Sequence, residues 1–310
     1  MTEQMVDRLL DEGFELADRG SLEAALGRFE QVVEIDEGNA EAWMMRGAIK
    51  GELGVFQEAL TCLDKAVLLD AGYANSHYLR SKVLLSSGRL DEAEASARKA
   101  VELDPEFGEA WLVISGICGQ SHRIEEAEAC CRRAIARLPD PADAKSYLAY
   151  LLNLRREFAE AVPLYQEILA RDPASAQINF NIGTAYRGLG KTGEAEQHYA
   201  QAIELAPDFA DAYSALGDLL LMRKTNIAKA LKYCRTAVEI NPLNAEFQNR
   251  LELALTAAGS PEKRQLLDRL EEDHIFSGMQ EPMSIAKNLS VLYPDEHGEA
   301  SDVLIRMFSN

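Results

Sequence analysis

The sequence predicts an all-α solenoid built from helix–turn–helix repeats, because two kinds of residue return at one fixed interval. Proline stands 34 residues apart at Pro105, Pro139, Pro173 and Pro207. Alanine keeps the same interval over most of the chain, at Ala25, Ala59, Ala93, Ala127, Ala161 and Ala195. A period of this length is typical of arrays whose modules are pairs of helices. We therefore expect the 310 residues to form one extended array rather than two ordinary domains.

The register of these residues divides residues 1–243 into seven tandem repeats. Each repeat is expected to hold a first helix (helix A), a short turn, a second helix (helix B) and another turn. The repeats are 6–39, 40–73, 74–107, 108–141, 142–175, 176–209 and 210–243. The last one carries an extra residue in its inter-helix turn, within residues 223–227. Positions are counted below from the first residue of each repeat.

Glycine is expected to end helix A in most repeats. Position fifteen holds Gly20, Gly54, Gly88 and Gly190 in four repeats, and His122, Arg156 and Lys224 in the other three. Glycine suits a left-handed residue just past a helix end, because it has no Cβ to clash. The recurring prolines are expected to stop helix B and to direct the chain into the next helix A.

Small residues inside both helices predict that helices A and B of one repeat cross at close range. Position eight reads Gly13, Gly47, Ser81, Ser115, Ala149, Gly183 and Gly217. Position twenty-seven, the expected partner from helix B, reads Val32, Ala66, Ala100, Ala134, Ile168, Ala202 and Ala237. Glycine is a poor helix former, so its recurrence inside a helix needs a packing reason.

The pattern fades after residue 243. Residues 244–274 are expected to form C-terminal capping helices, because a terminal repeat must present a solvated outer face and residues 262–273 are strongly polar. Residues 275–310 depart from the period, and we expect an appended tail of short helices there. The alternative is a flexible tail that docks into the groove of its own chain or of a neighbour.

By these residues the chain resembles the tetratricopeptide-repeat (TPR) family over roughly residues 6–243. The resemblance implies a right-handed superhelix whose inner surface is lined by helices A. One position departs from the family pattern. The Trp or Tyr of the family at position four is present as Trp43, Trp111 and Tyr213, and is replaced by Leu9, His77, Lys145 and Asn179 in the other repeats.

The resemblance further implies that positions two, five, six, nine and twelve of each repeat face the inner groove. The candidate partner-binding residues at these positions are Met44, Met45, Tyr78, Lys82, Leu112, Tyr147, Tyr150, Phe180, Asn181 and Arg187. Carboxylates at position two form an acidic border. An exposed strip of Tyr, Phe and Met is typical of a binding surface. The alternative is that these side chains pack between adjacent helices A.

Charge and hydropathy limit the classes of partner. The formal net charge is −19, from 32 basic and 51 acidic side chains, which disfavours nucleic acid and anionic membranes as partners. A protein or peptide with basic flanks would fit such a surface, although acidic side chains can also serve solubility alone. No apolar run approaches the roughly 18–20 residues of a membrane span, and residues 1–13 lack the layout of a signal peptide. The sequence therefore predicts a cytoplasmic protein.

No pattern of catalytic, metal-binding or cofactor-binding residues is recognisable. The five cysteines occupy helix positions of the repeat and are predicted to be small buried core residues. The five histidines lack the spacing of metal ligands, and no GxSxG nucleophile motif is present. We therefore expect no enzymatic activity, no metal and no cofactor.

Position seven, which is normally apolar, holds Glu12, Arg46 and Arg80 in the first three repeats. Equivalent positions of neighbouring repeats lie about 8–10 Å apart, which long side chains can bridge. We expect an ion pair between Glu12 and Arg46. A second hypothesis is that Arg80 and Lys82 together receive a carboxylate of the partner.

These features favour a non-catalytic adaptor that binds a peptide or protein segment in the groove. Two alternatives remain: a scaffold that assembles with itself, and the regulatory subunit of a separate enzyme. Some members of the family clamp a C-terminal carboxylate with Lys and Asn at positions five and nine. Position five holds no such residue here, so chaperone tails of the EEVD kind are not expected as ligands.

Overall fold

The structure, a computed structural model, describes residues 2–258, and the regular elements of this part are all α-helices. The chain divides into two compact units, Met1–Pro173 and Ala174–Asn310, which are described separately below. We call the described parts the N-terminal unit (2–173) and the C-terminal unit (174–258). The expected polar capping helix at 262–273 and the expected tail at 275–310 lie outside the described residues.

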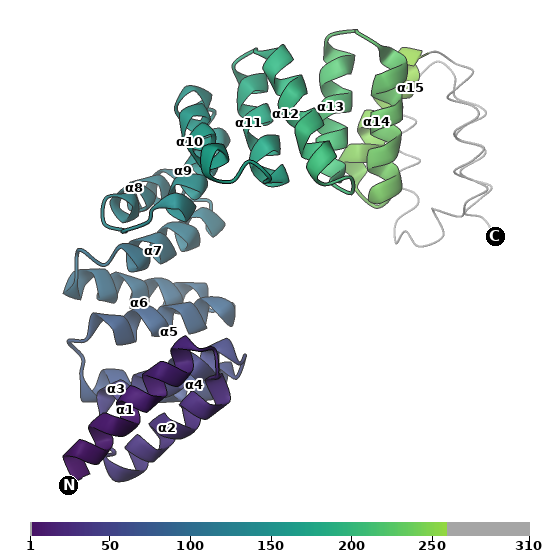
Figure 1. The fold of residues 1–310 in the computed structure, drawn as a ribbon. Helices are drawn as coiled ribbons and strands as arrows, with labels where there is room; N and C mark the ends of the chain where they lie inside the picture. Colours follow the sequence, from purple (N-terminus) through teal and green to yellow (C-terminus); the bar gives the residue numbers. More distant parts are fainter. Residues whose placement is uncertain (1, 259–310) are drawn as a thin grey trace, which may run out of the picture. The chain divides into compact units, whose positions relative to one another are not determined.

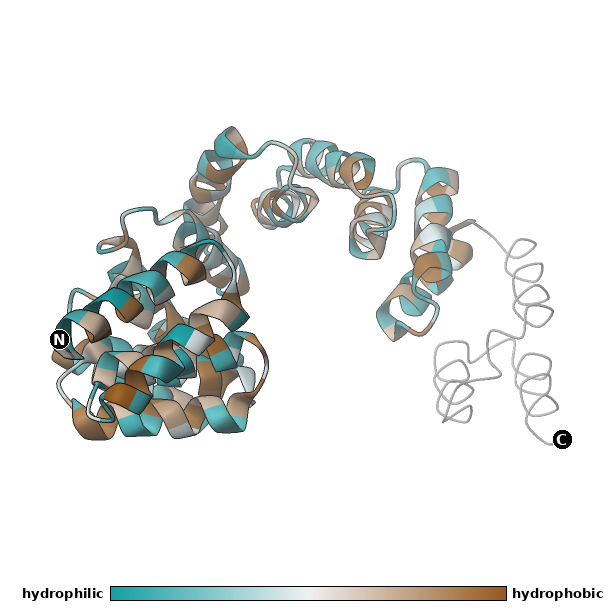
Figure 2. Ribbon diagram, turned by 60° about the horizontal axis from the view of Figure 1, so that its bottom comes forward, coloured by the Kyte–Doolittle hydropathy of each residue, from teal (hydrophilic) through white to brown (hydrophobic). Residues whose placement is uncertain are grey.

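The N-terminal unit consists of ten helices that pack as successive antiparallel pairs (Figure 1). They are α1 (Thr2–Asp18), α2 (Leu22–Ile35), α3 (Ala40–Glu52), α4 (Phe56–Leu69), α5 (Ala74–Ser86), α6 (Leu90–Leu103), α7 (Gly108–Gln120), α8 (Ile124–Ile135), α9 (Ala142–Leu154) and α10 (Phe158–Arg171). Odd-numbered helices are helices A and even-numbered helices are helices B. In Figure 2 hydrophobic and hydrophilic residues alternate along these helices, as expected when one face of each helix is buried.

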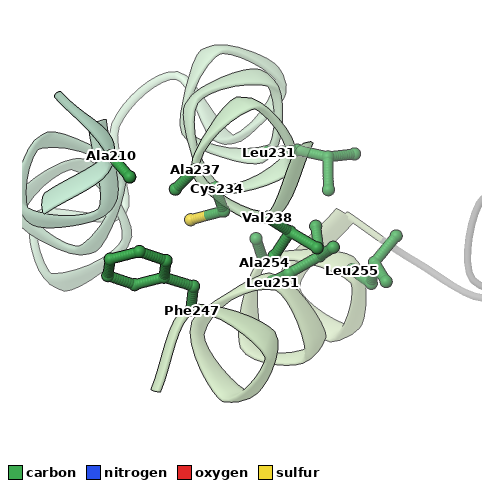
Figure 3. Packing of buried hydrophobic residues seen from close by; sticks show 9 residues of the cluster. All are labelled: Ala210, Leu231, Cys234, Ala237, Val238, Phe247, Leu251, Ala254 and Leu255. Carbon is green, nitrogen blue, oxygen red and sulfur yellow. The ribbon is translucent and has the colours of Figure 1, made fainter. Parts of the chain in front are cut away.

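The C-terminal unit continues the same alternation with five described helices. They are α11 (Ala176–Gly188), α12 (Thr192–Leu205), α13 (Ala210–Met222), α14 (Ile227–Ile240) and α15 (Ala245–Ala258). Helix α15 packs on both α13 and α14. Figure 3 shows Phe247 of α15 pointing toward Ala210, Cys234 and Ala237, which are all buried. The chain is thus an all-α repeat solenoid, the fold class that the sequence predicts.

The recurring alanines of helix B lie in the core. Ala25, Ala59, Ala93, Ala127, Ala161 and Ala195 are each fully buried. A larger side chain at these sites would force helix A away from helix B, which explains why so small a residue returns in every repeat.

Position eight approaches helix B closely, as the sequence predicts, but the partner is position twenty-four rather than position twenty-seven. A Cβ on Gly47 would lie 2.5 Å from Cγ of Leu63, and a Cβ on Gly217 would lie 2.6 Å from Sγ of Cys234. Position twenty-seven packs between its own helix A and the next repeat. The buried Val32, for example, belongs to a cluster with Val6 and Leu9 of α1 and with Ala42 of α3.

The turn after helix A contains a residue in the left-handed region in all seven repeats. The φ angles of Gly20, Gly54, Gly88 and Gly190 lie between 73° and 78°, and those of His122, Arg156 and Lys224 are 58°, 63° and 52°. The extra residue of the last repeat is accommodated by a second left-handed residue, Asn226, whose side chain accepts a hydrogen bond from the backbone N–H of Lys229 at the start of α14.

Candidate peptide-binding surface

The helices A of the N-terminal unit form a continuous surface. Helix α3 contacts α5, and α5 contacts α7, so side chains of neighbouring repeats meet directly on this side of the stack. We call this surface the helix-A face. It carries the predicted residues Met45, Tyr78, Lys82, Leu112, Tyr147 and Tyr150.

A pocket of about 420 Å³ opens between α7 and α9 on the helix-A face. Helix α7 contributes Gly116, Gly119 and Gln120, and helix α9 contributes Tyr147, Tyr150, Leu151 and Leu154. His122 and Ile124, from the turn after α7 and the start of α8, complete the lining. The pocket therefore joins two predicted residues, Tyr147 and Tyr150, to residues of the preceding repeat.

Tyr147 is seated against the backbone of α7. Its hydroxyl oxygen lies 2.0 Å from the point that a Cβ on Gly119 would occupy, so only glycine leaves room for this ring. The rings of Tyr147 and Tyr150 stack, with centroids 6.1 Å apart and an angle of 23° between their planes. Burial raises the pKa of Tyr147 above its ordinary value, so the phenol stays neutral at physiological pH.

The outer part of the pocket is apolar and exposed. Tyr150 is 45% exposed and Leu154 is 50% exposed, although both are large hydrophobic side chains. Because they lie one helical turn apart on α9, they form one exposed apolar strip beside the glycines of α7. A strip of this kind can bury an apolar side chain of a partner.

Two other aromatic residues among the predicted set pack within their own repeat. The ring of Tyr78, at position five, lies 4.8 Å from that of Phe107, at the last position of the same repeat. The ring of Phe180 lies 5.1 Å from that of Phe209 in the equivalent pair of the C-terminal unit, and 5.7 Å from that of Tyr199. These contacts leave both residues half-buried, and they hold the linker at the end of each repeat against its helix A.

Met44 is not on the surface. It shares position five with Tyr78 and Phe180, but it is only 2% exposed and packs with Leu60 and Leu63. The prediction that Met44 lies on the partner-binding surface was therefore wrong, because its side chain is in the core. An unbranched, flexible side chain can turn into a gap in the core that a ring cannot enter.

The remaining predicted residues differ in their exposure to solvent and in the bonds that they already make. Met45 and Leu112 are half-buried, whereas Lys82 is exposed and its Nζ lies 5.7 Å from the centre of the Tyr78 ring. In the C-terminal unit, Arg187 forms an ion pair of 2.5 Å with Asp218, and Asn181 accepts a hydrogen bond from the side chain of Gln177.

The charged residues at position seven bond to helix B rather than to one another. Glu12 pairs with Arg28 at 3.0 Å, and Arg46 pairs with Glu30 at 3.5 Å, so the expected pair between Glu12 and Arg46 was wrong. An arginine at this position reaches a carboxylate on the helix B of the preceding repeat, whereas Glu12 pairs with the helix B of its own repeat.

Arg80 follows the same rule and is already engaged. It donates hydrogen bonds of 2.6 Å to Asp64 and 2.6 Å to Ser96. A guanidinium held in this way by two helices B is not available to a carboxylate of a partner. Lys82 would have to act without it.

The helix-A face of the N-terminal unit carries an excess of unpaired acids. Seven exposed carboxylates on its helices A have no ion pair or hydrogen bond with the described residues: Asp7, Asp11, Asp18, Glu41, Glu52, Glu109 and Asp143. The arginines of this unit are mostly held elsewhere. All except Arg133 and Arg156 are paired with a carboxylate. The face therefore attracts positive charge.

Ion pairs on the other side of the N-terminal unit link neighbouring repeats. Arg123 donates to Glu94 at 3.0 Å, and Arg98 bonds to Glu126. Glu94, Cys118 and Glu126 bring potential metal ligands within 4.8 Å of one another, but the two arginines already occupy the carboxylates. The arrangement is an ion-pair network between α6 and α8. Burial also raises the pKa of the Cys118 thiol to about 11.

All five cysteines are buried and unpaired, as the sequence predicts. No helix among residues 2–258 is both long enough and apolar enough to cross a membrane.

Sequence reasoning missed part of the pocket. Gly119, Gln120, His122 and Leu154 were not among the candidate residues, and Gly116 lacked a role. One signal was readable: within the seven repeats, only helix A of the fourth carries glycine at both positions nine and twelve.

Helix pairs stacked in one register, with one side of the stack carrying an open pocket, define a helical-repeat protein. The chain belongs to the tetratricopeptide-repeat family. One family profile described as "Tetratricopeptide repeat" matches residues 50–106 and 180–245, and a second profile of the same description matches residues 84–151.

Two curated plant proteins are similar over part of the chain. Hsp70-Hsp90 organizing protein 3 of Arabidopsis thaliana is 24% identical over 127 residues, which cover 41% of this chain and 23% of the relative. The Hsp70-Hsp90 organizing protein of Triticum aestivum is 22% identical over 128 residues, covering 41% and 22%. The chain thus matches less than a quarter of the length of either relative.

Two solved structures share the fold. YrrB, described as a TPR protein with an unusual peptide-binding site, has a TM-score of 0.53 at 22% identity, over 60% of this chain and 96% of that chain. PilF of Pseudomonas aeruginosa has a TM-score of 0.58 at 18% identity, over 69% and 96%. At these identities the likeness extends to the fold alone.

Proposed function

We propose that the chain is a non-catalytic, cytoplasmic adaptor that binds a peptide or protein segment on the helix-A face of the N-terminal unit. The observation that carries the proposal is the open pocket between α7 and α9, where Tyr150 and Leu154 expose apolar surface that folding leaves uncovered. Stacked helical repeats commonly use such a face to bind extended partners. The names of the chaperone-organizing relatives and of YrrB agree with a role in protein interaction.

The partner segment should carry Lys or Arg beside an apolar anchor. Unpaired acids border the helix-A face, and Asp143 lies one turn before Tyr147 on α9. An opposite charge on the partner would speed association and favour one class of peptide over another. The absence of the carboxylate-clamp residues at position five argues for a ligand other than a chaperone tail.

Short synthetic peptides, labelled with a fluorophore and followed by anisotropy, test this function. Each peptide carries a large apolar residue flanked either by lysines and arginines or by glutamates. We expect the basic series to bind and the acidic series to bind at least about tenfold more weakly, which corresponds to ~1.4 kcal/mol. Binding of the basic series should weaken as salt is added.

The variants Tyr150→Ala and Leu154→Ala should each weaken binding about tenfold, as expected for anchors at the centre of an interface. Leu68→Ala is the matched control, because Leu68 is 78% exposed on α4, a helix B. Equal binding of both peptide series, or losses in the control as large as those at Tyr150, would refute the proposal. Light scattering of the full chain and of a chain lacking residues 275–310 checks the alternative of self-assembly, which predicts a smaller particle after truncation.

A further inference from the structure

The pocket between α7 and α9 has the form of a slot with one bare wall. On the α7 side, the lining consists of Gly116, Gly119 and Gln120, and the helix backbone is bare at Gly116, where no side chain covers it. On the α9 side stand Tyr147, Tyr150 and Leu154. A flat group entering the slot would lie against peptide planes on one side and aromatic or aliphatic side chains on the other.

The packing of the chain does not account for Gly116. A glycine inside a helix is destabilising relative to alanine, so its presence calls for a reason. Gly47 and Gly217 are required by close packing, since a Cβ on either would lie within 2.6 Å of a neighbouring side chain. A Cβ on Gly116 would meet nothing within 4 Å. The space beside Gly116 is therefore open to a group from outside the chain.

Gly119 has a different task, which is to position Tyr147. The phenol oxygen occupies the space of the missing Cβ, so the ring is drawn onto α7 and closes one end of the slot. Tyr150 stacks beside it and leaves a ring face and Leu154 at the open end. The shape of the slot thus depends on two glycines with separate functions.

Resting on the function proposed above, we propose that this slot is a specificity pocket for one aromatic side chain of the bound peptide, with a Lys or Arg nearby in the peptide. The ring lies on the backbone at Gly116 and against Tyr150 and Leu154. Aromatic pairs attract each other more strongly than the area that they bury accounts for. The volume of about 420 Å³ is ample for an indole or a phenol.

Charge and polarity agree with this occupant. Gln120 and His122 stand at the rim, where a tyrosine hydroxyl or a tryptophan N–H could find a polar partner. The exposed carboxylates of Glu109 and Asp143 have no ion pair among the described residues, and they lie on the two helices that form the slot. Each lies seven residues, about two turns, before a slot residue of the same helix (Gly116 and Tyr150), so a cationic residue of the peptide that extends toward the start of α7 and α9 would approach them.

The test varies both sides of the contact. Peptides of one basic sequence carry Trp, Phe, Leu or Ala at the anchor position, and anisotropy measures their affinity for the wild type, Gly116→Ala and Gly116→Leu. Gly27→Leu is the control, because Gly27 is also a helical glycine with nothing within 4 Å of its Cβ position, but on α2. Circular dichroism and thermal melting confirm that each variant is folded.

We expect the wild type to bind the Trp and Phe peptides at least fivefold more tightly than the Leu peptide, a difference of about 1 kcal/mol in binding free energy. The Ala peptide should bind most weakly. Gly116→Leu should abolish the preference for a ring and weaken the Trp peptide about tenfold or more, whereas Gly116→Ala should have a smaller effect. Gly27→Leu should bind as the wild type does.

Other outcomes separate the two proposals. If Tyr150→Ala weakens binding but Gly116→Leu leaves the Trp peptide unaffected, the peptide-binding face stands and the slot is refuted. Equal affinity for the Trp and Leu peptides would likewise overturn the aromatic preference alone. If no basic peptide binds the wild type, the proposed function itself fails and the slot with it.

Discussion

The indole nitrogen of Trp111 donates a hydrogen bond to the carbonyl oxygen of Pro105, at a distance of 2.9 Å. Trp43 makes the same bond to Glu37, and His77 and Gln248 bond in the same way to Ala71 and Pro242, always six residues back. The carbonyls that end a helix or begin a turn lack partners within the helix, so a side chain must supply one. His77, which departs from the family residue at position four, thus keeps the contact of that position.

Trp111→Phe should lower the free energy of unfolding by up to about 1 kcal/mol, because the Pro105 carbonyl loses one of its two donors and keeps the bond of 2.7 Å from Nε of Arg137. Urea unfolding followed by the fluorescence of the remaining Trp43 measures the effect in the N-terminal unit. Tyr213→Phe, whose unfolding is followed by circular dichroism because it lies in the C-terminal unit, is the control, since this residue shares position four but has no bond to the preceding turn among those described. Unchanged stability of Trp111→Phe would show that the hydrogen bond contributes nothing.

Gly47→Ala and Gly116→Ala should change stability in opposite directions, although both replace a glycine in the interior of a helix A. At Gly47 the new methyl would lie 2.5 Å from Leu63 and 3.0 Å from the carbonyl oxygen of Ala59, which should cost about 1–3 kcal/mol. At Gly116 the methyl enters open space, and the better helix propensity of alanine should add up to about 1 kcal/mol. Tryptophan-detected urea unfolding compares the two, and a shift of the same sign in both would contradict the packing assigned here.

Arg156→Gly should stabilise the N-terminal unit by about 1 kcal/mol. Arg156 has a φ of 63°, which costs about 1–2 kcal/mol for a residue with a Cβ, while the added freedom of glycine in the unfolded chain offsets part of the gain. The reverse change, Gly190→Arg, should destabilise the C-terminal unit by a similar amount, because Gly190 has a φ of 73°. Thermal unfolding followed by circular dichroism checks both, and a loss of stability in Arg156→Gly would count against strain in this turn.

Acid should weaken the ion-pair network between α6 and α8. Hydrogen bonding from Arg123 lowers the pKa of Glu94 below its ordinary value of 4.5, against the opposing effect of burial. A carboxyl whose pKa is lowered by folding stabilises the native state above its unfolded pKa, and this stabilisation is lost as pH falls through the folded pKa. The loss should therefore begin near pH 4.5 and continue below it.

Glu94→Gln should cost about 1–2 kcal/mol at pH 7 and less at pH 4, where the wild type has itself begun to lose the pair. Glu92→Gln is the control, because the pair between Arg89 and Glu92 is exposed to solvent and should contribute little to stability. Urea unfolding at both pH values measures the difference. A cost at Glu94 that did not shrink in acid would argue against this source of pH dependence.

The contacts that recur in every repeat could be predicted from the sequence, whereas the contacts made by a single side chain in one repeat could not. The period placed the buried alanines and the glycine turns, because the same backbone geometry returns in each repeat and requires the same small residue. Arg46 pairs with Glu30 because the long side chain of Glu30, on helix B, ends beside it, and the repeat pattern does not give the position of that end. Met44 is buried because of a local gap in the core, which the pattern does not give either. The pocket depended on side chains that are absent at Gly116 and Gly119, and an absence gives little signal unless neighbouring repeats are compared position by position.

The contact between position eight and position twenty-four has a consequence for building chimaeras. Gly13 faces Phe29, Gly183 faces Tyr199 and Gly217 faces Cys234, so a glycine of helix A makes room for a side chain on its own helix B. The third, fourth and fifth repeats hold a larger residue at this position, namely Ser81, Ser115 and Ala149. The alanines that meet the next repeat are nearly uniform by comparison. Whole repeats should therefore be exchangeable as cassettes cut between helix B and the next helix A, whereas hybrids that join helix A of one repeat to helix B of another should clash or leave a void.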